Sequence, residues 1–221
     1  MSGIDYWRQL DFLSLDDLEG VKVTVIGCGG IGSFVAFALA KLGVRAFELW
    51  DGDAVESHNI PNQCFKRSQV GKTKAGALCS VIKEVGDEIA VLCHESFWKG
   101  EPLEGIVISA VDDMKVRGQI WKACKLNPSV SLLVDGRIGG EEVKVLGVRP
   151  TDIDDIRSYE KTLYSNEEAK ELPCTARAVI DVAFLVAALI VRVVRGFLKS
   201  GECRTFIASM HEPTIHTVVG G

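Results

Sequence analysis

A glycine-rich turn, followed at a distance by an aspartate, is the clearest chemical signal in this sequence. The glycines are Gly27, Gly29, Gly30 and Gly32, and Asp51 follows them by about 20 residues. Glycines let a ligand phosphate approach bare backbone N–H groups at the start of a helix, and a carboxylate at this spacing accepts hydrogen bonds from ribose hydroxyls. These residues predict a nucleotide site, and by themselves they fit a dinucleotide as well as a mononucleotide.

Further charged residues could take part in chemistry at the same site. Lys72 and Lys74 stand near the start of a helical segment, where a bound anion would offset their repulsion by the helix dipole; two ordinary surface lysines are the alternative. Asp112 follows a predicted strand and could bind Mg²⁺, which prefers carboxylate oxygens. An aspartate in this place can also cap the next helix, and Asp113 is suited to that role.

One cysteine stands apart from the others by its context. Cys174 is predicted to lie at the start of a long helix, where exposed N–H groups favour the thiolate, and Arg177 one turn later could add to this effect. A small buried side chain is the more common role of a single cysteine, so both interpretations stay open.

These side chains need alternating strands and helices to bring them to one edge of a sheet. An apolar run predicts a strand over 21–26 before the glycine turn, and helical spacing predicts a helix over 33–42 after it. Further strands are predicted at 44–50, 90–93, 106–110, 130–134 and 142–148, further helices at 70–85, 114–125 and 174–195, and a terminal hairpin at 205–210 and 214–219. The fold class is therefore α/β: a Rossmann-like, mostly parallel sheet with helices on both faces and a C-terminal antiparallel extension.

The remaining segments are connections. Residues 1–20 predict an N-terminal helical arm, and residues 51–69 form a polar connection that is long enough to suggest a function. Residues 150–173 are rich in acidic side chains and predict a crossover loop or lid. We expect one domain over residues 1–221.

Composition narrows the class of protein. The chain has 221 residues and a net charge of −5, which argues against a nonspecific nucleic-acid binder. Seven cysteines without a C-x-x-C pair or a signal peptide predict reduced thiols, a cytoplasmic location and no zinc. The apolar segment 178–194 contains Asp181 and Arg192, which favours a buried helix over a membrane span.

Several ordered motifs, read together, resemble those of the ThiF, MoeB and HesA family, the ubiquitin-activating-enzyme-like adenylyltransferases. GCGGIGS is similar to the family's nucleotide loop GxGGxGS. DGDAVESHNIPNQ is similar to D-x-D-x-V-x-x-S-N-L-x-R-Q, which implies that Asp51 binds the ribose and that Asp53, Asn59 and Gln63 belong to the same site.

Three more motifs extend the resemblance. VGKTKA is similar to V-G-x-x-K and makes Lys74 the phosphate lysine, and VDDMKVR resembles D-N-x-x-x-R and makes Asp112 the Mg²⁺ carboxylate. DYWRQL resembles the R-Y-x-R-Q arm, whose arginine, here Arg8, reaches the ATP site of the partner subunit. Cys174 stands where the family keeps its crossover-loop cysteine.

The resemblance implies a reaction. The chain would bind Mg-ATP, take the C-terminal glycine carboxylate of a ubiquitin-like or sulfur-carrier protein ending in Gly-Gly, and form an acyl-adenylate with release of pyrophosphate. Cys174 would then accept the acyl group as a thioester, since a thiolate of low pKa is a good nucleophile. A homodimer is implied because Arg8 would act in trans. Neither a nucleic acid nor a membrane is expected as a partner.

Departures from the family pattern keep alternatives open. Asn62 stands where the family has an arginine, for which Arg67 or Lys72 could substitute, and the change favours a noncatalytic partner subunit as one alternative. The glycine turn and Asp51 alone would also fit an NAD(P)-dependent oxidoreductase. A third alternative is a related adenylyltransferase whose substrate is a peptide or an RNA-borne carboxylate, such as the threonylcarbamoyl-adenosine dehydratases, in which Cys174 could be dispensable. The terminal Gly220-Gly221 resembles the tails that the family activates, or is a frayed end.

Overall fold

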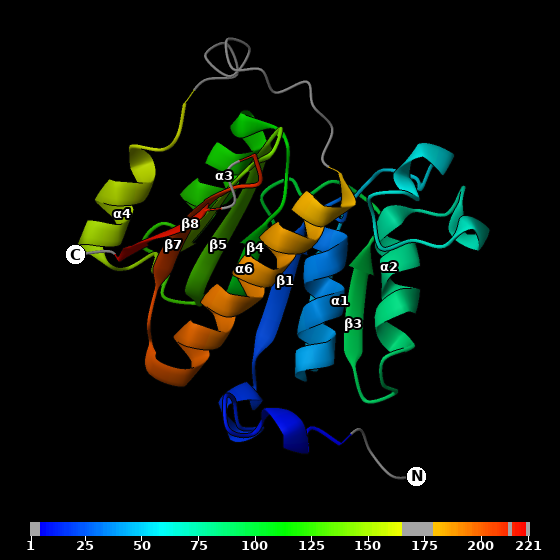
Figure 1. The fold of residues 1–221 in the computed structure, drawn as a ribbon, viewed down its shortest axis with the longest axis horizontal. Helices are drawn as coiled ribbons and strands as arrows, with labels where there is room; N and C mark the ends of the chain where they lie inside the picture. Colours follow the sequence, from blue (N-terminus) through cyan, green and yellow to red (C-terminus); the bar gives the residue numbers. More distant parts are fainter. Residues whose placement is uncertain (1–4, 165–178, 212–213, 220–221) are drawn as a thin grey trace.

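One mixed sheet organises the molecule. The computed structural model describes residues 5–164, 179–211 and 214–219. Within them, eight strands form a sheet in the order β3-β2-β1-β4-β5-β6-β7-β8 (Figure 1). The strands from β3 to β5 are parallel, and β5 to β8 pair antiparallel. The predicted parallel sheet with a C-terminal antiparallel extension is confirmed.

The elements follow the predicted order. The strands are β1 (Lys22–Ile26), β2 (Ala46–Trp50), β3 (Ala90–His94), β4 (Gly105–Ser109), β5 (Val130–Gly139), β6 (Glu142–Val148), β7 (Arg204–Ser209) and β8 (Thr214–Val219). The described helices are α1 (Gly32–Leu42), α2 (Lys74–Lys83), α3 (Met114–Cys124), α4 (Ile153–Glu160) and α6 (Ile180–Ser200). In this part of the chain, no helix is long and apolar enough to cross a membrane.

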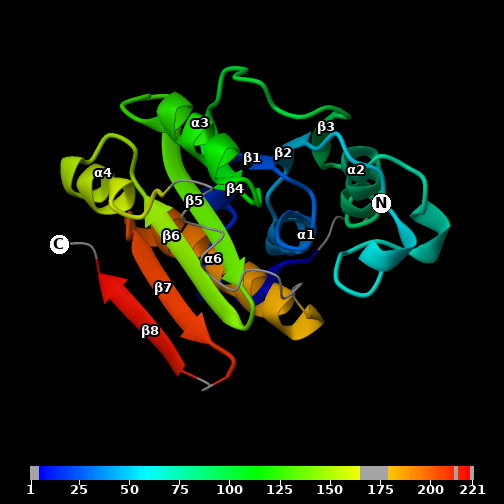
Figure 2. The same cartoon turned by 90° about the horizontal axis from the view of Figure 1, so that it is seen from above.

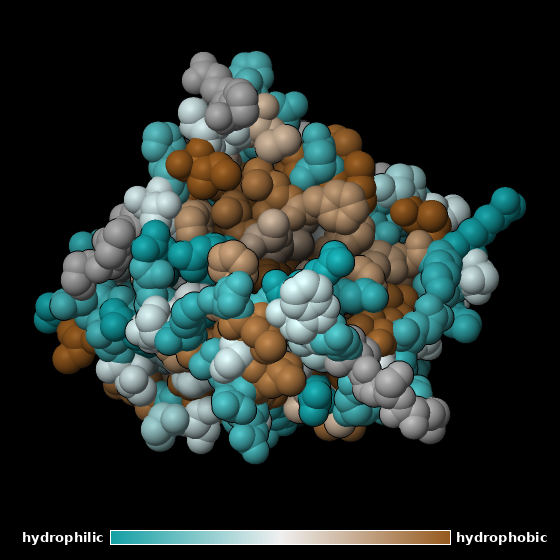
Figure 3. Space-filling model, turned by 60° about the horizontal axis from the view of Figure 1, so that its bottom comes forward, coloured by the Kyte–Doolittle hydropathy of each residue, from teal (hydrophilic) through white to brown (hydrophobic). Residues whose placement is uncertain are grey.

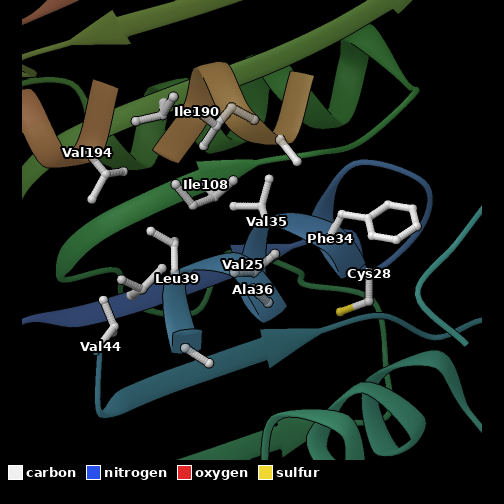
Figure 4. Packing of buried hydrophobic residues seen from close by; sticks show 14 of the residues in the cluster. Val25, Cys28, Phe34, Val35, Ala36, Leu39, Val44, Ile108, Ile190 and Val194 are labelled. Carbon is white, nitrogen blue, oxygen red and sulfur yellow. The ribbon is translucent and has the colours of Figure 1, made fainter. Parts of the chain in front are cut away.

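Helices cover both faces of the sheet. Seen from above, α1, α2 and α6 lie on one side and α3 and α4 on the other (Figure 2). On the first side, Val35 and Leu39 of α1 pack among Val25 of β1, Ile108 of β4 and Ile190 of α6, all of them fully buried (Figure 4). A second apolar cluster fills the space under α3 and α4. Burial on both faces explains why the parallel strands are continuous apolar runs.

One strand end and one connection differ from the sequence prediction. The strand expected to end at residue 134 continues to Gly139, because residues 135–139 pair with β6 across a tight turn at Gly140, whose φ is +65°. The segment expected to be a polar crossover loop contains helix α4. It forms because the Asp152 carboxylate accepts hydrogen bonds from the backbone N–H groups of residues 154 and 155, both at 3.0 Å, and because Tyr159 is buried.

Helix boundaries also shift. Helix α2 begins at Lys74 with Thr73 as its N-cap, so Lys72 lies before the helix rather than in its first turn. The long helix α6 begins at Ile180 and continues to Ser200, five residues past the predicted end at 195. The N-terminal arm contains two short 3₁₀ turns, Trp7–Gln9 and Asp16–Leu18.

Candidate nucleotide site

The glycine turn follows the carboxyl end of β1 and packs closely against the backbone at the end of β4. Gly27 has a φ of +91°, and a Cβ there would lie 2.6 Å from the carbonyl oxygen of Ala110, next to β4. A Cβ on Gly32 would lie 1.9 Å from the carbonyl oxygen of Gly27. In contrast, a Cβ on Gly29 would meet nothing within 4 Å. Gly27 and Gly32 are therefore needed for folding, whereas Gly29 leaves open space for a ligand.

This contrast gives a paired prediction. Gly32→Ala should lower the free energy of unfolding by about 1–3 kcal/mol, since the added methyl group overlaps the turn backbone. Gly29→Ala should leave it within about 0.5 kcal/mol of the wild type and should reduce only the rise in melting temperature that ATP produces. Urea unfolding and melting curves with and without Mg-ATP measure both effects. An unchanged ATP response in Gly29→Ala would contradict phosphate binding at this turn.

Asp51 is hydrogen-bonded to the glycine turn. Its Oδ2 accepts a hydrogen bond from the Cys28 N–H at 2.7 Å, and its Oδ1 accepts one from the Asp53 N–H at 2.8 Å. Burial raises the pKa of the Asp51 carboxyl, although the two hydrogen bonds act in the opposite direction. Each carboxylate oxygen keeps a further lone pair, so a ribose hydroxyl can still donate to Asp51. Burial also raises the pKa of the Cys28 thiol, which makes this cysteine a poor nucleophile.

Lys74 is the one basic residue among the described residues that line the pocket at this turn. Its Nζ lies 2.9 Å from Oδ2 of Asp53, and the Lys74 side chain is only 13% exposed whereas that of Asp53 is 55% exposed. An ion pair with a half-exposed partner is weak. A phosphate in the pocket could therefore take the place of Asp53 at little cost.

A cavity of about 500 Å³ joins these residues, a size typical of small-molecule sites. Its polar lining includes Gly27, Gly29, Gly30, Asp51, Asp53, Gln63, Lys74 and Asp112. Gln63 carries a buried Oε1 that has no hydrogen-bond partner among the described residues. A ligand donor in the cavity would satisfy this oxygen.

An aromatic wall that was not predicted from the sequence completes the cavity. The wall consists of Trp50, Phe97 and Trp98. The Trp50 ring stacks on His94, with ring centroids 3.5 Å apart, and the Phe97 ring covers Gly52, where a Cβ would lie 2.9 Å from it. These flat apolar side chains can stack on a nucleobase. The signal available in the sequence was the aromatic pair Phe97-Trp98, which begins three residues after the end of β3, at the carboxyl edge of the sheet.

Asp112 lies at the mouth of the same cavity and is exposed. Its neighbour Asp113 caps α3 by accepting a hydrogen bond from the Lys115 N–H at 2.6 Å, as predicted. The Asp112 carboxylate fits a Mg²⁺ ion that also takes phosphate oxygens and water, because Mg²⁺ in nucleotide sites is usually held by one or two carboxylates. Among the described residues, no three His, Cys, Asp or Glu side chains group together, so none of these residues forms a metal site made of protein ligands alone.

A buried ionic cluster holds the turn before Asp112. Asp135 is fully buried, and its carboxylate lies 3.1 Å from Nε of Arg117 and 2.8 Å from Nη2 of Arg137. The Tyr159 hydroxyl donates to the same carboxylate at 2.9 Å. Arg117 in turn donates from Nη1 to the carbonyl oxygen of Val111 at 3.2 Å. The cluster therefore links the end of β4 to β5 and fixes the backbone that carries Asp112.

Some predicted site residues lie elsewhere. Asn59 is buried, and its Oδ1 accepts a hydrogen bond from the Glu56 N–H at 2.9 Å, so its visible role is to hold the turn at Ser57–Asn59. Arg67 and Lys72, the suggested substitutes for an arginine at position 62, are not among the described residues that line the cavity. Cys174, Arg177 and the Gly220-Gly221 tail lie outside the described residues.

Arg8 belongs to the N-terminal arm, in the 3₁₀ turn Trp7–Gln9. This arm lies at the end of the sheet opposite the carboxyl ends of the parallel strands (Figure 1). The arm is held there because Nε2 of Gln9 donates to the carbonyl oxygen of Leu42 at 2.6 Å. Leu42 is the last residue of α1, so the arm is separated from the glycine turn by the length of that helix, about 16 Å. Arg8 therefore does not contribute to the cavity of its own chain.

Comparison with known proteins identifies relatives. The model of the ThiF family matches residues 4–216. Over 116 residues the chain is 33% identical to the maize "Adenylyltransferase and sulfurtransferase MOCS3-2", covering 49% of this chain and 24% of that protein. It is 30% identical over 136 residues to the "tRNA threonylcarbamoyladenosine dehydratase" of Haemophilus influenzae, covering 58% of this chain and 52% of that protein. The chain thus spans about half or less of these relatives.

Solved structures share the fold. The crystal structure of E. coli MccB with ATP superposes with a TM-score of 0.73 at 21% identity, covering 93% of this chain and 65% of that one. MccB with AMPCPP and MccA gives a TM-score of 0.75, also at 21% identity, covering 93% and 66% of the two chains. At this identity the likeness concerns the fold.

Proposed function

Because the chain belongs to the ThiF family, we propose that it binds ATP with Mg²⁺ and adenylates the C-terminal carboxylate of a ubiquitin-like or sulfur-carrier protein ending in Gly-Gly. One observation carries the proposal: the glycine turn, Asp51, Lys74 and Asp112 line a single cavity of about 500 Å³. Relatives named adenylyltransferases and the MccB structure with ATP support it.

The reaction needs positioning and charge neutralisation rather than proton transfer. A carboxylate oxygen of the substrate attacks the α-phosphorus of ATP, a new C–O–P linkage forms, and the bond from that phosphorus to the bridging oxygen of pyrophosphate breaks. Both reactants are anions, so the backbone N–H groups after Gly27 and the ammonium group of Lys74 reduce their repulsion. Bound Mg²⁺ would add positive charge, with Asp112 as its protein ligand. Asp51 and the aromatic wall would fix the nucleoside, which aligns the α-phosphate for attack.

A second step involves Cys174. Its thiolate would attack the acyl carbon of the adenylate, forming a thioester and releasing AMP. Pyrophosphate exchange reports only the first step and is therefore independent of this cysteine.

Pyrophosphate exchange tests the first step. With ATP, Mg²⁺, labelled pyrophosphate and a polypeptide ending in Gly-Gly, the purified chain should return label to ATP. The same polypeptide with a C-terminal amide should give no exchange, because the nucleophile is missing. If no Gly-Gly polypeptide supports exchange, and NAD rather than ATP raises the melting temperature, the oxidoreductase alternative is favoured. If exchange appears only after a second, related chain is added, this chain is a partner subunit.

We also propose that the active form is a homodimer. Hydrophobic residues gather over the face that α1 and α6 cover (Figure 3). Phe184 of α6 is 54% exposed, and on the arm Phe12 is 59% and Trp7 64% exposed. A two-fold axis across this face would run the helices of the two subunits antiparallel. The arm lies at the C-terminal end of α1, and the glycine turn lies at its N-terminal end. The arm of one subunit would then reach the glycine turn of the other, which would bring Arg8 to the partner's ATP site.

Mixing two inactive variants tests this arrangement. Arg8→Ala and Asp112→Ala homodimers should each be nearly inactive in exchange. In an exchanged heterodimer, the subunit with intact Asp112 receives Arg8 from its partner, so an equal mixture should recover about a quarter of the wild-type rate. Full activity of Arg8→Ala alone, or no recovery in a mixture shown to contain heterodimers, would contradict action in trans.

A further inference from the structure

Two cations face each other on the open side of the antiparallel extension. Arg137 on β5 is directly opposite Lys144 on β6, and Lys144 is directly opposite Ile207 on β7. Directly opposite residues of antiparallel strands project from the same face, with Cβ atoms about 5 Å apart, and like charges in such a pair destabilise the sheet. Lys144 therefore lies beside a like charge on this face of the sheet.

The two cations differ in how they are neutralised. Arg137 binds Asp135 and also donates from Nη1 to the carbonyl oxygen of Thr162 at 2.7 Å. Asp135 is also ion-paired with Arg117, so one carboxylate is the counter-charge of two guanidinium groups. Lys144 is half-buried and makes no ion pair or hydrogen bond to any other described residue. Burial, and then the positive charge of Arg137, lower the pKa of its ammonium group, although the Asp135 carboxylate acts in the opposite direction. An anion beside Lys144 would relieve both effects.

The two cations border a groove that continues to the nucleotide cavity. A hollow of about 730 Å³ is lined by Arg137, Lys144, Lys161, Tyr164 and Ile207. Arg137 and Tyr164 also line a smaller hollow of about 260 Å³, which reaches Asp112 at the mouth of the nucleotide cavity. Figure 2 looks onto the broad face of β5 to β8. A chain lying in the groove would thus have its end at the nucleotide cavity.

Under the function proposed above, the C-terminal segment of the polypeptide substrate would approach the nucleotide cavity along this groove. We propose that Lys144, supported by Arg137, selects an acidic side chain in that segment. The proposal rests on the function proposed above and adds a sequence preference to it. The path from the end of β4 to Lys144 on β6 crosses two strand spacings, about 10 Å, which an extended chain covers in about three residues. With the reach of the side chains, the acidic residue belongs three to five positions before the terminal carboxylate, by the same rough estimate.

The lining favours a polypeptide over an RNA. Ile138 and Ile207 contribute apolar surface to the groove, and Glu142 contributes a negative charge at its edge. A phosphate backbone needs a broad positive surface, whereas here the positive charge is local and the whole chain carries −5. A single carboxylate flanked by apolar residues matches the groove better.

Matched peptides provide the test. The probes are fluorescent heptapeptides that end in Gly-Gly with a free carboxylate and carry Glu or Gln at the third, fourth or fifth position from the end. Binding to the full chain in the presence of Mg-AMP is followed by anisotropy. For at least one position, we expect the Glu peptide to bind about tenfold more tightly than the Gln peptide. Lys144→Gln should remove this preference without weakening the Gln peptide, and Lys144→Glu should transfer the preference to a Lys peptide. Lys122→Gln, at an exposed lysine of α3, should behave like the wild type.

Several outcomes overturn the proposal. Equal binding of the Glu and Gln peptides at all three positions would do so, as would equal weakening of both by Lys144→Gln or a lack of binding by every peptide. Binding of an RNA hairpin that is lost in Lys144→Gln, in place of peptide binding, would assign the groove to nucleic acid. The proposed function fails separately. Glu-selective binding without any pyrophosphate exchange would support selection by Lys144 and refute adenylation. Exchange without a preference for Glu would support adenylation and refute selection by Lys144.

Discussion

Asp112→Ala should reduce polypeptide-dependent pyrophosphate exchange by about a thousandfold or more. Asp112 is the exposed carboxylate at the mouth of the nucleotide cavity, and its loss would remove the proposed ligand to Mg²⁺. Metal charge stabilises a phosphoryl transition state by several kcal/mol, and about 1.4 kcal/mol corresponds to a tenfold change in rate. The melting temperature without nucleotide should stay close to that of the wild type, because an exposed carboxylate contributes little to folding.

Two variants serve as controls for this result. Asp113→Asn keeps a side-chain oxygen that can cap α3, so exchange should stay near the wild-type rate. Cys174→Ala should leave exchange intact and remove only a conjugate that thiols cleave. Exchange that survives Asp112→Ala would refute the assignment of Asp112 to Mg²⁺. Equal losses in the 112 and 113 variants would point to the turn as a whole rather than to one carboxylate.

Asp135→Asn should produce the largest loss of stability among the variants considered. Asp135 is fully buried against Arg117 and Arg137, and the amide would leave both guanidinium groups without a counter-charge. Breaking a buried ion pair by removing one partner costs about 3–5 kcal/mol, because the remaining charge stays buried. Urea unfolding measures this free energy directly.

A surface variant and a double variant make this prediction specific. Asp154→Asn removes an ion pair to Arg157 in which both side chains are more than 70% exposed, so its cost should stay below about 1 kcal/mol. Adding Arg137→Gln to Asp135→Asn removes one of the two uncompensated cations and should recover part of the lost stability. A loss below about 1 kcal/mol in Asp135→Asn would show that Asp135 does not neutralise the two arginines.

Local patterns account for the part of the site that the sequence predicts. The glycine turn, Asp51 and Asp112 each follow a parallel strand, and the carboxyl ends of parallel strands meet at one edge whatever their order. Lys74 joins them because helix α2 begins there, after the polar connection has returned to that edge. Their convergence in one cavity therefore follows from the βαβ pattern alone.

The remaining parts depend on contacts that no local pattern contains. The ionic cluster of Asp135 requires β5 to lie beside β4 and to continue past residue 134, and the polar residues there predict a strand end instead. Phe97 enters the site because the connection after β3 folds over Gly52. The opposition of Arg137 and Lys144 is a matter of register, which the turn at Gly140 sets.

The fate of a carboxylate oxygen tests the central claim most directly. A polypeptide that supports exchange is labelled with oxygen-18 in its C-terminal carboxylate and incubated with the chain, Mg-ATP and a thiol that captures the acyl group. If the carboxylate attacks the α-phosphorus, the oxygen that forms the linkage leaves with the nucleotide, so the AMP should carry one oxygen-18 atom. AMP without the label, or ADP with phosphate as the products, would contradict acyl-adenylate formation by this chain.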